Sequence, residues 1–173
     1  SSSVYTAKIN SDGSLGTWIQ TTPLPKSVIY HRVATFGNRI YAVGGYHDPS
    51  GTALESTVYS AVPIDANGNL GPWRTETGMG RNFGVGGLVV INNRIYISGG
   101  LTLTNSASAD VRYAAINSDG TLGAWTLDTA LNVGGPAAQW QFPAVAYGNK
   151  IYMLGGGGAG ANIHMADVPF GGI

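Results

Sequence analysis

A nine-residue stretch occurs three times in this chain and constrains the fold more than any other feature. The copies span residues 37–45, 92–100 and 148–156, and each contains an Ile-Tyr pair followed by Gly-Gly. Each reads as a two-residue turn, a short apolar strand and a double-glycine exit. Three such copies indicate a repeat protein.

A second motif repeats with nearly the same period. Asp/Asn-rich turns precede Leu-Gly-x-Trp at Trp18, Trp73 and Trp125, which lie 55 and 52 residues apart. The Ile-Tyr pairs beginning at 40, 95 and 151 are separated by 55 and 56 residues. A period near 50–55 residues with four short strands per period predicts a β-propeller. Because no segment has a helical period, we expect an all-β fold class.

The strands of the first period follow from alternating apolar residues bounded by Gly, Pro and Asn. The pattern predicts strands at residues 4–9, 15–20, 31–36, 39–43 and 57–62, and a last strand at 162–168. The chain therefore opens with two outer strands, runs through two complete blades and closes with three strands.

The chain resembles kelch repeats. The features that carry this resemblance are an inner strand at 31–36, the turn at 37–38, Ile40 to Gly45, the Val58-Tyr59 pair and Trp73. The resemblance extends over the whole chain, which we interpret as one domain, 1–173. Its repeats are about 4–57, 58–110 and 111–162, with a partial fourth repeat at 163–173. The D-G-x-L-G-x-W motif is similar to a variant found in bacterial kelch-like proteins.

The sequence departs from the family at one place. Kelch repeats often carry Arg and His ahead of the inner strand, and this chain has them only as His31-Arg32. The equivalent pairs are Gly86-Gly87 and Phe142-Pro143.

The repeated aromatic residues are interpreted as packing residues. Each tryptophan of the repeated series can bury roughly 150–250 Å² between neighbouring blades. The tyrosines at 41, 96 and 152 are expected to pack within and between blades. Gly-Gly is expected at the strand end because the blades converge there and side chains would collide.

About three four-stranded blades are too few for a closed ring, since propellers need at least about four. Two solutions are open. A second copy completes a six-bladed homodimer, which is the interpretation we favour, or the remaining repeats belong to a longer chain. The strand at 162–168 is then in excess, because it aligns with residues 4–9 of the partner.

Composition excludes several classes of function. Charged residues are 10% of the chain against roughly 25% in an average soluble domain. A formal net charge of zero with scattered basic residues argues against nucleic acid. The chain has no Cys, and no apolar run is long enough for a membrane span. Low charge with abundant Ser, Thr and Asn is typical of bacterial secreted proteins, so we expect an extracellular or cell-surface location.

The resemblance implies a binding face formed by two kinds of loop, those that join the outermost strand of one blade to the inner strand of the next and those that join the second strand of a blade to its third. The candidate ligand-binding residues in those loops are Tyr30, His31, Arg32, Tyr46, His47, Asp48, Arg81, Asn82, Trp140 and Gln141. Trp140 lies outside the repeated tryptophan series. With Arg81 it would make a sugar-stacking pair, and loop packing is the alternative.

No motif for catalysis or metal binding stands out. The three histidines at 31, 47 and 164 have no ligand spacing, so we expect neither a metal nor a cofactor. The sequence predicts a non-catalytic binding or structural module for a glycan or protein partner. A propeller-fold hydrolase or isomerase, with a site formed only in the assembled ring, is the alternative.

Overall fold

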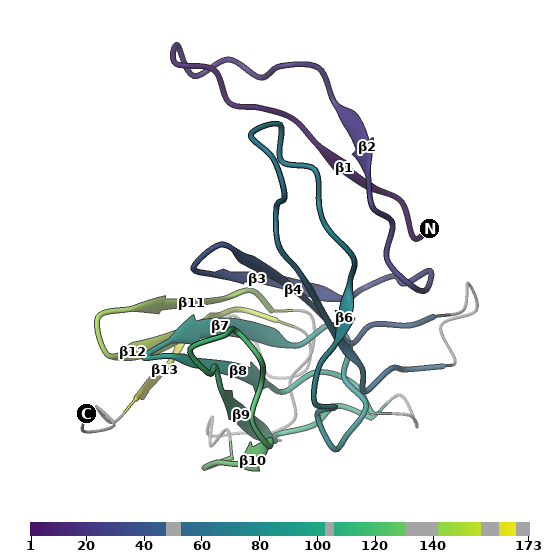
Figure 1. Ribbon diagram of the computed structural model, residues 1–173. Helices are drawn as coiled ribbons and strands as arrows, with labels where there is room; N and C mark the ends of the chain where they lie inside the picture. Colours follow the sequence, from purple (N-terminus) through teal and green to yellow (C-terminus); the bar gives the residue numbers. More distant parts are fainter. Residues whose placement is uncertain (48–52, 103–105, 131–141, 157–162, 169–173) are drawn as a thin grey trace.

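The structure is a computed structural model that describes residues 1–47, 53–102, 106–130, 142–156 and 163–168. Within these residues it is all-β, and its strands form antiparallel sheets (Figure 1). The strands are β1 Val4–Thr6, β2 Ile19–Thr21, β3 Arg32–Phe36, β4 Arg39–Val43, β5 Val58–Ala61, β6 Arg74–Thr75, β7 Gly87–Ile91, β8 Arg94–Ser98, β9 Val111–Ala115, β10 Thr126–Leu127, β11 Ala144–Tyr147, β12 Lys150–Leu154 and β13 Ile163–Asp167.

The strands pair in the order that the repeats predict. Two sheets have four strands, β3-β4-β5-β6 and β7-β8-β9-β10, and a third has the order β11-β12-β13. The β1–β2 ribbon forms the fourth sheet and extends beyond the others (Figure 1). The inner strand β7 contacts both β3 and β11, so the three larger sheets converge on their first strands.

The thrice-repeated stretch forms a tight hairpin turn and a backbone crossing. Its first turn residue has positive φ in every copy: Gly37 at 58°, Asn92 at 51° and Gly148 at 60°. Glycine and asparagine adopt this conformation most readily. The Gly44-Gly45 pair also has positive φ, 61° and 95°.

The double glycine leaves room for the backbone of the next repeat. A Cβ on Gly44 would lie 2.2 Å from the carbonyl oxygen of Phe83. The amide of Gly45 donates to the same oxygen at 2.7 Å. Gly-Gly is therefore a packing requirement where two sheets converge.

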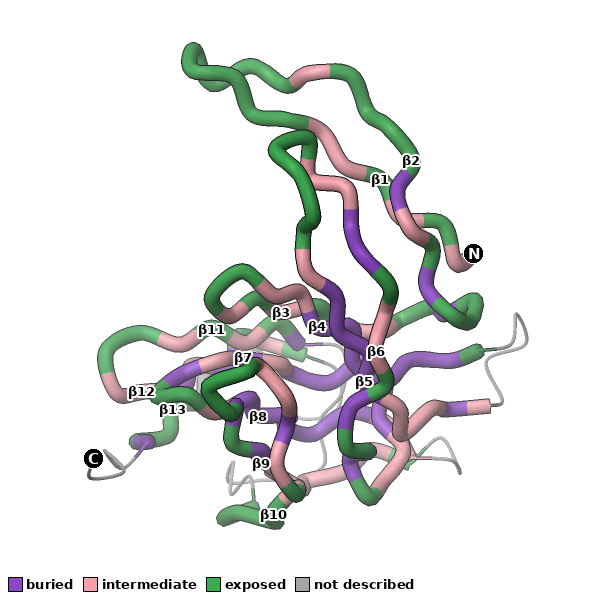
Figure 2. The backbone as a smooth tube through the Cα atoms, in the orientation of Figure 1, coloured by how far each residue is buried: buried purple, intermediate pink, exposed green. Residues whose placement is uncertain are grey.

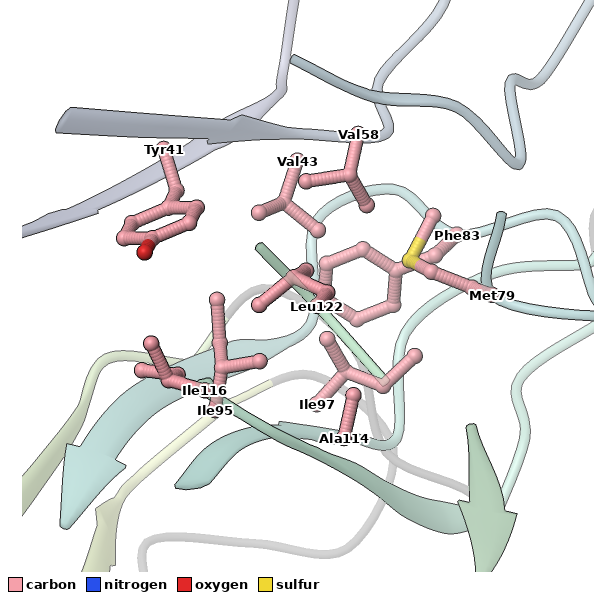
Figure 3. Close-up of a cluster of buried hydrophobic side chains, with 10 residues drawn as sticks. All are labelled: Tyr41, Val43, Val58, Met79, Phe83, Ile95, Ile97, Ala114, Ile116 and Leu122. Carbon is pink, nitrogen blue, oxygen red and sulfur yellow. The ribbon is translucent and has the colours of Figure 1, made fainter. Parts of the chain in front are cut away.

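The main core lies between the two complete sheets. Tyr41, Val43 and Val58 from one sheet pack against Ile95 and Ile97 from the other. Figure 3 shows these side chains facing one another, with Phe83 and Met79 beside them. The smaller cores follow the same pattern between neighbouring sheets.

Two predictions need correction. Strands predicted at 4–9 and 15–20 are the shorter β1 and β2, because the register changes between the Thr6–Ile19 pair and the isolated Ile9–Leu15 bridge, where residues 7–8 face residues 16–18. The predicted burial of the repeated tryptophans is correct for the partly buried Trp73 and Trp125. It is wrong for Trp18, which is 61% exposed because no sheet of the described residues packs against it as the β1–β2 ribbon packs against Trp73.

Candidate functional site

An open groove of about 490 Å³ lies where the three inner strands converge. Most of its lining comes from β3, β7, β11 and the residues just before each of them. The lining residues are Tyr30, Arg32, Val33, Val85, Leu88, Phe142, Pro143 and Ala144. Two predicted binding residues, Tyr30 and Arg32, are among them.

The backbone at the groove takes an unusual conformation twice. Tyr30 and Val85 occupy equivalent positions in consecutive repeats, with φ of 56° and 53°. A β-branched residue rarely adopts positive φ, and such outliers are often retained at functional sites. The amide of Val85 donates to the carbonyl of Tyr30 at 3.3 Å, which couples the two segments.

Tyr30 presents an aromatic ring to solvent. Its ring meets that of Tyr46 edge to face, with centroids 6.2 Å apart and planes at 82°. Tyr46 is 5% exposed, whereas Tyr30 is 58% exposed. The buried Tyr46 therefore packs against the ring of Tyr30, and the exposed ring of Tyr30 is accessible to a ligand.

Arg32 connects two sheets and supplies positive charge to the groove. Its Nε donates to the carbonyl oxygen of Gly86 at 2.6 Å. Burial lowers the pKa of Arg32, which nonetheless stays charged at neutral pH. Among the described residues no group accepts a hydrogen bond from its two Nη groups, so these donors are available for a ligand.

His31 precedes β3 and does not line the groove. It lines a second hollow, of about 350 Å³, together with Val4 and Trp73. Its Nδ1 is buried and has no hydrogen-bond partner among the described residues. The structure therefore separates His31 from Arg32, although the two are adjacent in sequence.

His31 should make stability depend on pH. Burial, and then the charge of Arg32, lower the pKa of His31 below 6.5. The unfolded chain binds a proton more readily, so this contribution is complete above pH 6.5 and decreases as the pH falls toward the folded pKa. We expect an NMR titration midpoint below 6.5, and a weaker dependence of unfolding free energy on pH in His31→Gln. A midpoint at or above 6.5 would contradict this.

His47 belongs to a charged cluster with Lys26 and Glu55, none of which lines the groove. Its Nδ1 lies 3.1 Å from Glu55 Oε1, and Lys26 Nζ lies 2.9 Å from the same oxygen. Burial acts to raise the pKa of Glu55, but hydrogen bonds from Lys26 and Thr57 outweigh it and leave that pKa below its ordinary value. These contacts tie two loops together.

Arg81 does not line the groove, and its buried Nε and Nη1 have no hydrogen-bond partner among the described residues. Its Nη2 donates to the carbonyl of Gly99 at 2.5 Å, and its guanidinium lies 5.5 Å from the Phe83 ring centroid. Burial lowers its pKa. The neighbouring Asn82 is partly buried and does not line the groove. The predicted partner Trp140 lies outside the described residues, as do Asp48 and Gln141.

Sequence reasoning missed the apolar lining of the groove. The candidates did not include Val33, Val85, Leu88 or the Phe142–Ala144 segment, because these residues are aliphatic or lie at the start of a predicted inner strand and not in a loop. Aligning the three inner strands would have found them, since Val33, Leu88 and Ala144 hold the same position before the hairpin turn.

The described residues contain neither a metal-binding cluster nor a helix that could span a membrane. No three His, Asp or Glu side chains there lie close enough together to bind a metal ion. The described part of the chain also contains no helix with the length and hydropathy of a membrane span.

The chain is similar to several known proteins, although no family model matches it. It is 35% identical over 92 residues to Kelch-like protein terF of Aspergillus terreus, covering 52% of this chain and 19% of that protein. It is 27% identical over 147 residues to Kelch-like protein 23 of Mus musculus, covering 85% and 24%. The human Kelch-like protein 23 is 26% identical over 139 residues, covering 80% and 22%.

A solved structure supports the same fold. The structure of YjhT superposes with a TM-score of 0.64 at 14% identity, covering 84% of this chain and 44% of that one. The chain spans about a fifth to a quarter of the length of the curated relatives.

Proposed function

The chain belongs to the kelch-repeat family of β-propellers, and we propose that it is a binding module that holds a protein partner in the groove of β3, β7 and β11. The relatives named above are kelch-like proteins of greater length, so what they do as whole proteins is only a guide. The groove itself carries the proposal.

The lining of the groove suits recognition better than acid–base chemistry. The exposed ring of Tyr30 and the guanidinium of Arg32 lie beside an apolar floor that includes Leu88 and Phe142. The described lining residues include no carboxylate and no imidazole. General acid–base catalysis most often uses a carboxylate or an imidazole, and of the described lining residues only Tyr30 could serve instead, which favours binding over the hydrolase or isomerase alternative.

The chemistry of the lining favours an extended peptide segment. A guanidinium with free Nη groups pairs with carboxylate oxygens in a bidentate geometry. Tyr and Arg are enriched among the residues that dominate protein interfaces, and apolar floors receive aliphatic side chains. We therefore expect the partner to present an acidic residue next to an apolar one.

Selection from a displayed peptide library tests this function. Peptides enriched by the chain should carry Asp or Glu beside an aliphatic residue. Arg32→Gln should weaken their binding by roughly tenfold or more, since it removes a charged partner. Arg94→Gln is the matched control, because Arg94 stacks 4.5 Å from the Tyr113 ring and does not line the groove.

Two outcomes would contradict a protein-binding groove. One is equal peptide affinity for Arg32→Gln and the wild-type chain, with both shown to be folded by circular dichroism. The other is binding on a glycan array together with no enriched peptide, which would favour the sugar-binding alternative.

A further inference from the structure

A set of three hydrogen bonds joins the β1–β2 ribbon to the next sheet. The amide of Leu70 donates to Thr21 Oγ1 at 2.6 Å, and Thr22 Oγ1 donates to the carbonyl of Leu70. The indole Nε1 of Trp73 donates to the carbonyl of Thr22 at 3.0 Å. We call this set the inter-repeat latch; it joins a Leu–Trp segment to a Thr segment.

The same latch recurs between the two complete sheets. The amide of Leu122 donates to Glu76 Oε2 at 3.0 Å, and Thr77 Oγ1 donates to the carbonyl of Leu122 at 2.8 Å. Trp125 Nε1 donates to the carbonyl of Thr77 at 2.9 Å. Thr21 and Glu76 are different residue types that accept the same bond, so the latch is a property of the repeat.

One half of a third latch is exposed on the β1–β2 ribbon. Leu15 and Trp18 form the remaining Leu–Trp segment, and they are 58% and 61% exposed. Figure 2 shows most of this ribbon as exposed. Among the described residues none makes the latch bonds with this segment.

The other half follows β10. Asp128 and Thr129 occupy the positions of Glu76 and Thr77, and both are exposed. Asp128 Oδ1 accepts only the neighbouring amide of Thr129, at 2.7 Å, in the described part of the chain. A carboxylate, a hydroxyl and a carbonyl are therefore presented in the order that a Leu–Trp segment requires.

We propose that the Leu15–Trp18 segment of one copy of this chain binds the Asp128–Thr129 segment of a second copy. Each copy carries one segment of each kind, so two equivalent latches form and the assembly closes with twofold symmetry. The two exposed segments carry the same kinds of hydrogen-bond donors and acceptors that form the two latches within the chain.

An apolar face of β11 fits the same arrangement. Val89 and Ile91 on β7 pack against the β11–β12 sheet, and their equivalents Val145 and Tyr147 on β11 are 49% and 79% exposed. A second copy would cover this face with contacts of the kind seen inside the chain.

The arrangement has a consequence for β13. This strand pairs with β12 in the place that the partner's β1 strand would take. When the dimer closes, the partner's β1 would therefore replace β13 beside β12. The exposed Lys150–Asp167 ion pair holds β13 only weakly. The exchange would place Lys8 opposite Lys150, a cost that solvent screens on this exposed edge.

The mass in solution tests the proposal, measured by sedimentation over a range of concentrations. The expected mass is twice the 17.9 kDa of the chain. Trp18→Ala, or Asp128→Ala combined with Thr129→Val, should weaken dimerisation by roughly tenfold or more. These side chains are exposed, so the unfolding midpoint measured under monomeric conditions should stay close to that of the wild-type chain.

Mixing the two variants separates a lost interface from a lost fold. In the mixed dimer the substitutions of both variants lie in the same latch, and the other latch keeps all its wild-type residues. The mixture should therefore dimerise more tightly than either variant alone. A folded monomer at every concentration, or a mixture no tighter than its components, would overturn the proposal and would indicate that further repeats, not a second copy, cover these segments.

Discussion

Replacing Glu76 with alanine should lower the free energy of unfolding by roughly 3–5 kcal/mol. The Glu76 side chain is 3% exposed and accepts hydrogen bonds from Ser60 Oγ at 2.5 Å, Arg74 Nε at 2.8 Å and the Leu122 amide at 3.0 Å. Removing it leaves the buried Ser60 hydroxyl and the Leu122 amide without this acceptor, at about 1–3 kcal/mol each. Urea unfolding with a constant m-value measures the loss.

Glu76→Gln is the matched control. It keeps one acceptor oxygen and the volume of the side chain, so we expect a clearly smaller loss. Because Arg74 is 40% exposed, it can turn to water, and its ion pair contributes little to the difference. A loss below about 1 kcal/mol for Glu76→Ala would show that the contact between the two complete sheets does not depend on this carboxylate.

Replacing Gly44 with alanine should lower the free energy of unfolding about as much as Glu76→Ala does, because it distorts the backbone. The new Cβ would lie 2.2 Å from the Phe83 carbonyl oxygen, at a φ of 61°. Positive φ costs roughly 1–2 kcal/mol, and the displaced backbone adds about 1–3 kcal/mol. We expect a total loss of about 3 kcal/mol or more in thermal or urea unfolding.

Gly37→Ala isolates the contribution of the contact. Its φ of 58° is nearly the same, but an added Cβ would meet nothing within 4 Å. The loss should therefore be only the cost of positive φ, and Gly37→Asn should be close to neutral because Asn92 adopts this conformation in the next repeat. Equal losses for Gly44→Ala and Gly37→Ala would refute the packing explanation of the double glycine.

The repeats made the fold predictable from sequence. A turn, an apolar strand and Gly-Gly recur at a fixed period, and each copy forms a hairpin whose first turn residue has positive φ. Local chemistry determines these features, so the sequence suffices. Strand ends were less accurate because the register of the β1–β2 ribbon changes between its Thr6–Ile19 pair and its Ile9–Leu15 bridge.

The site was less predictable, because it depends on which face of a strand meets which neighbour. His31 and Arg32 were considered together, yet one lines the hollow beside Trp73 and the other the groove. Leu88 gave no signal of its own, since an apolar strand residue is most often core. Trp18 was expected to be buried like its equivalents, but burial depends on the neighbouring sheet.

Hydrogen exchange of the chain with and without a selected peptide tests the groove most directly. Bound peptide should slow amide exchange at residues 30–33, 84–88 and 142–144, and Arg32→Gln should abolish that protection at the same peptide concentration. Protection confined to the outer strands β6 and β10, with the groove residues unchanged, would contradict recognition at this site.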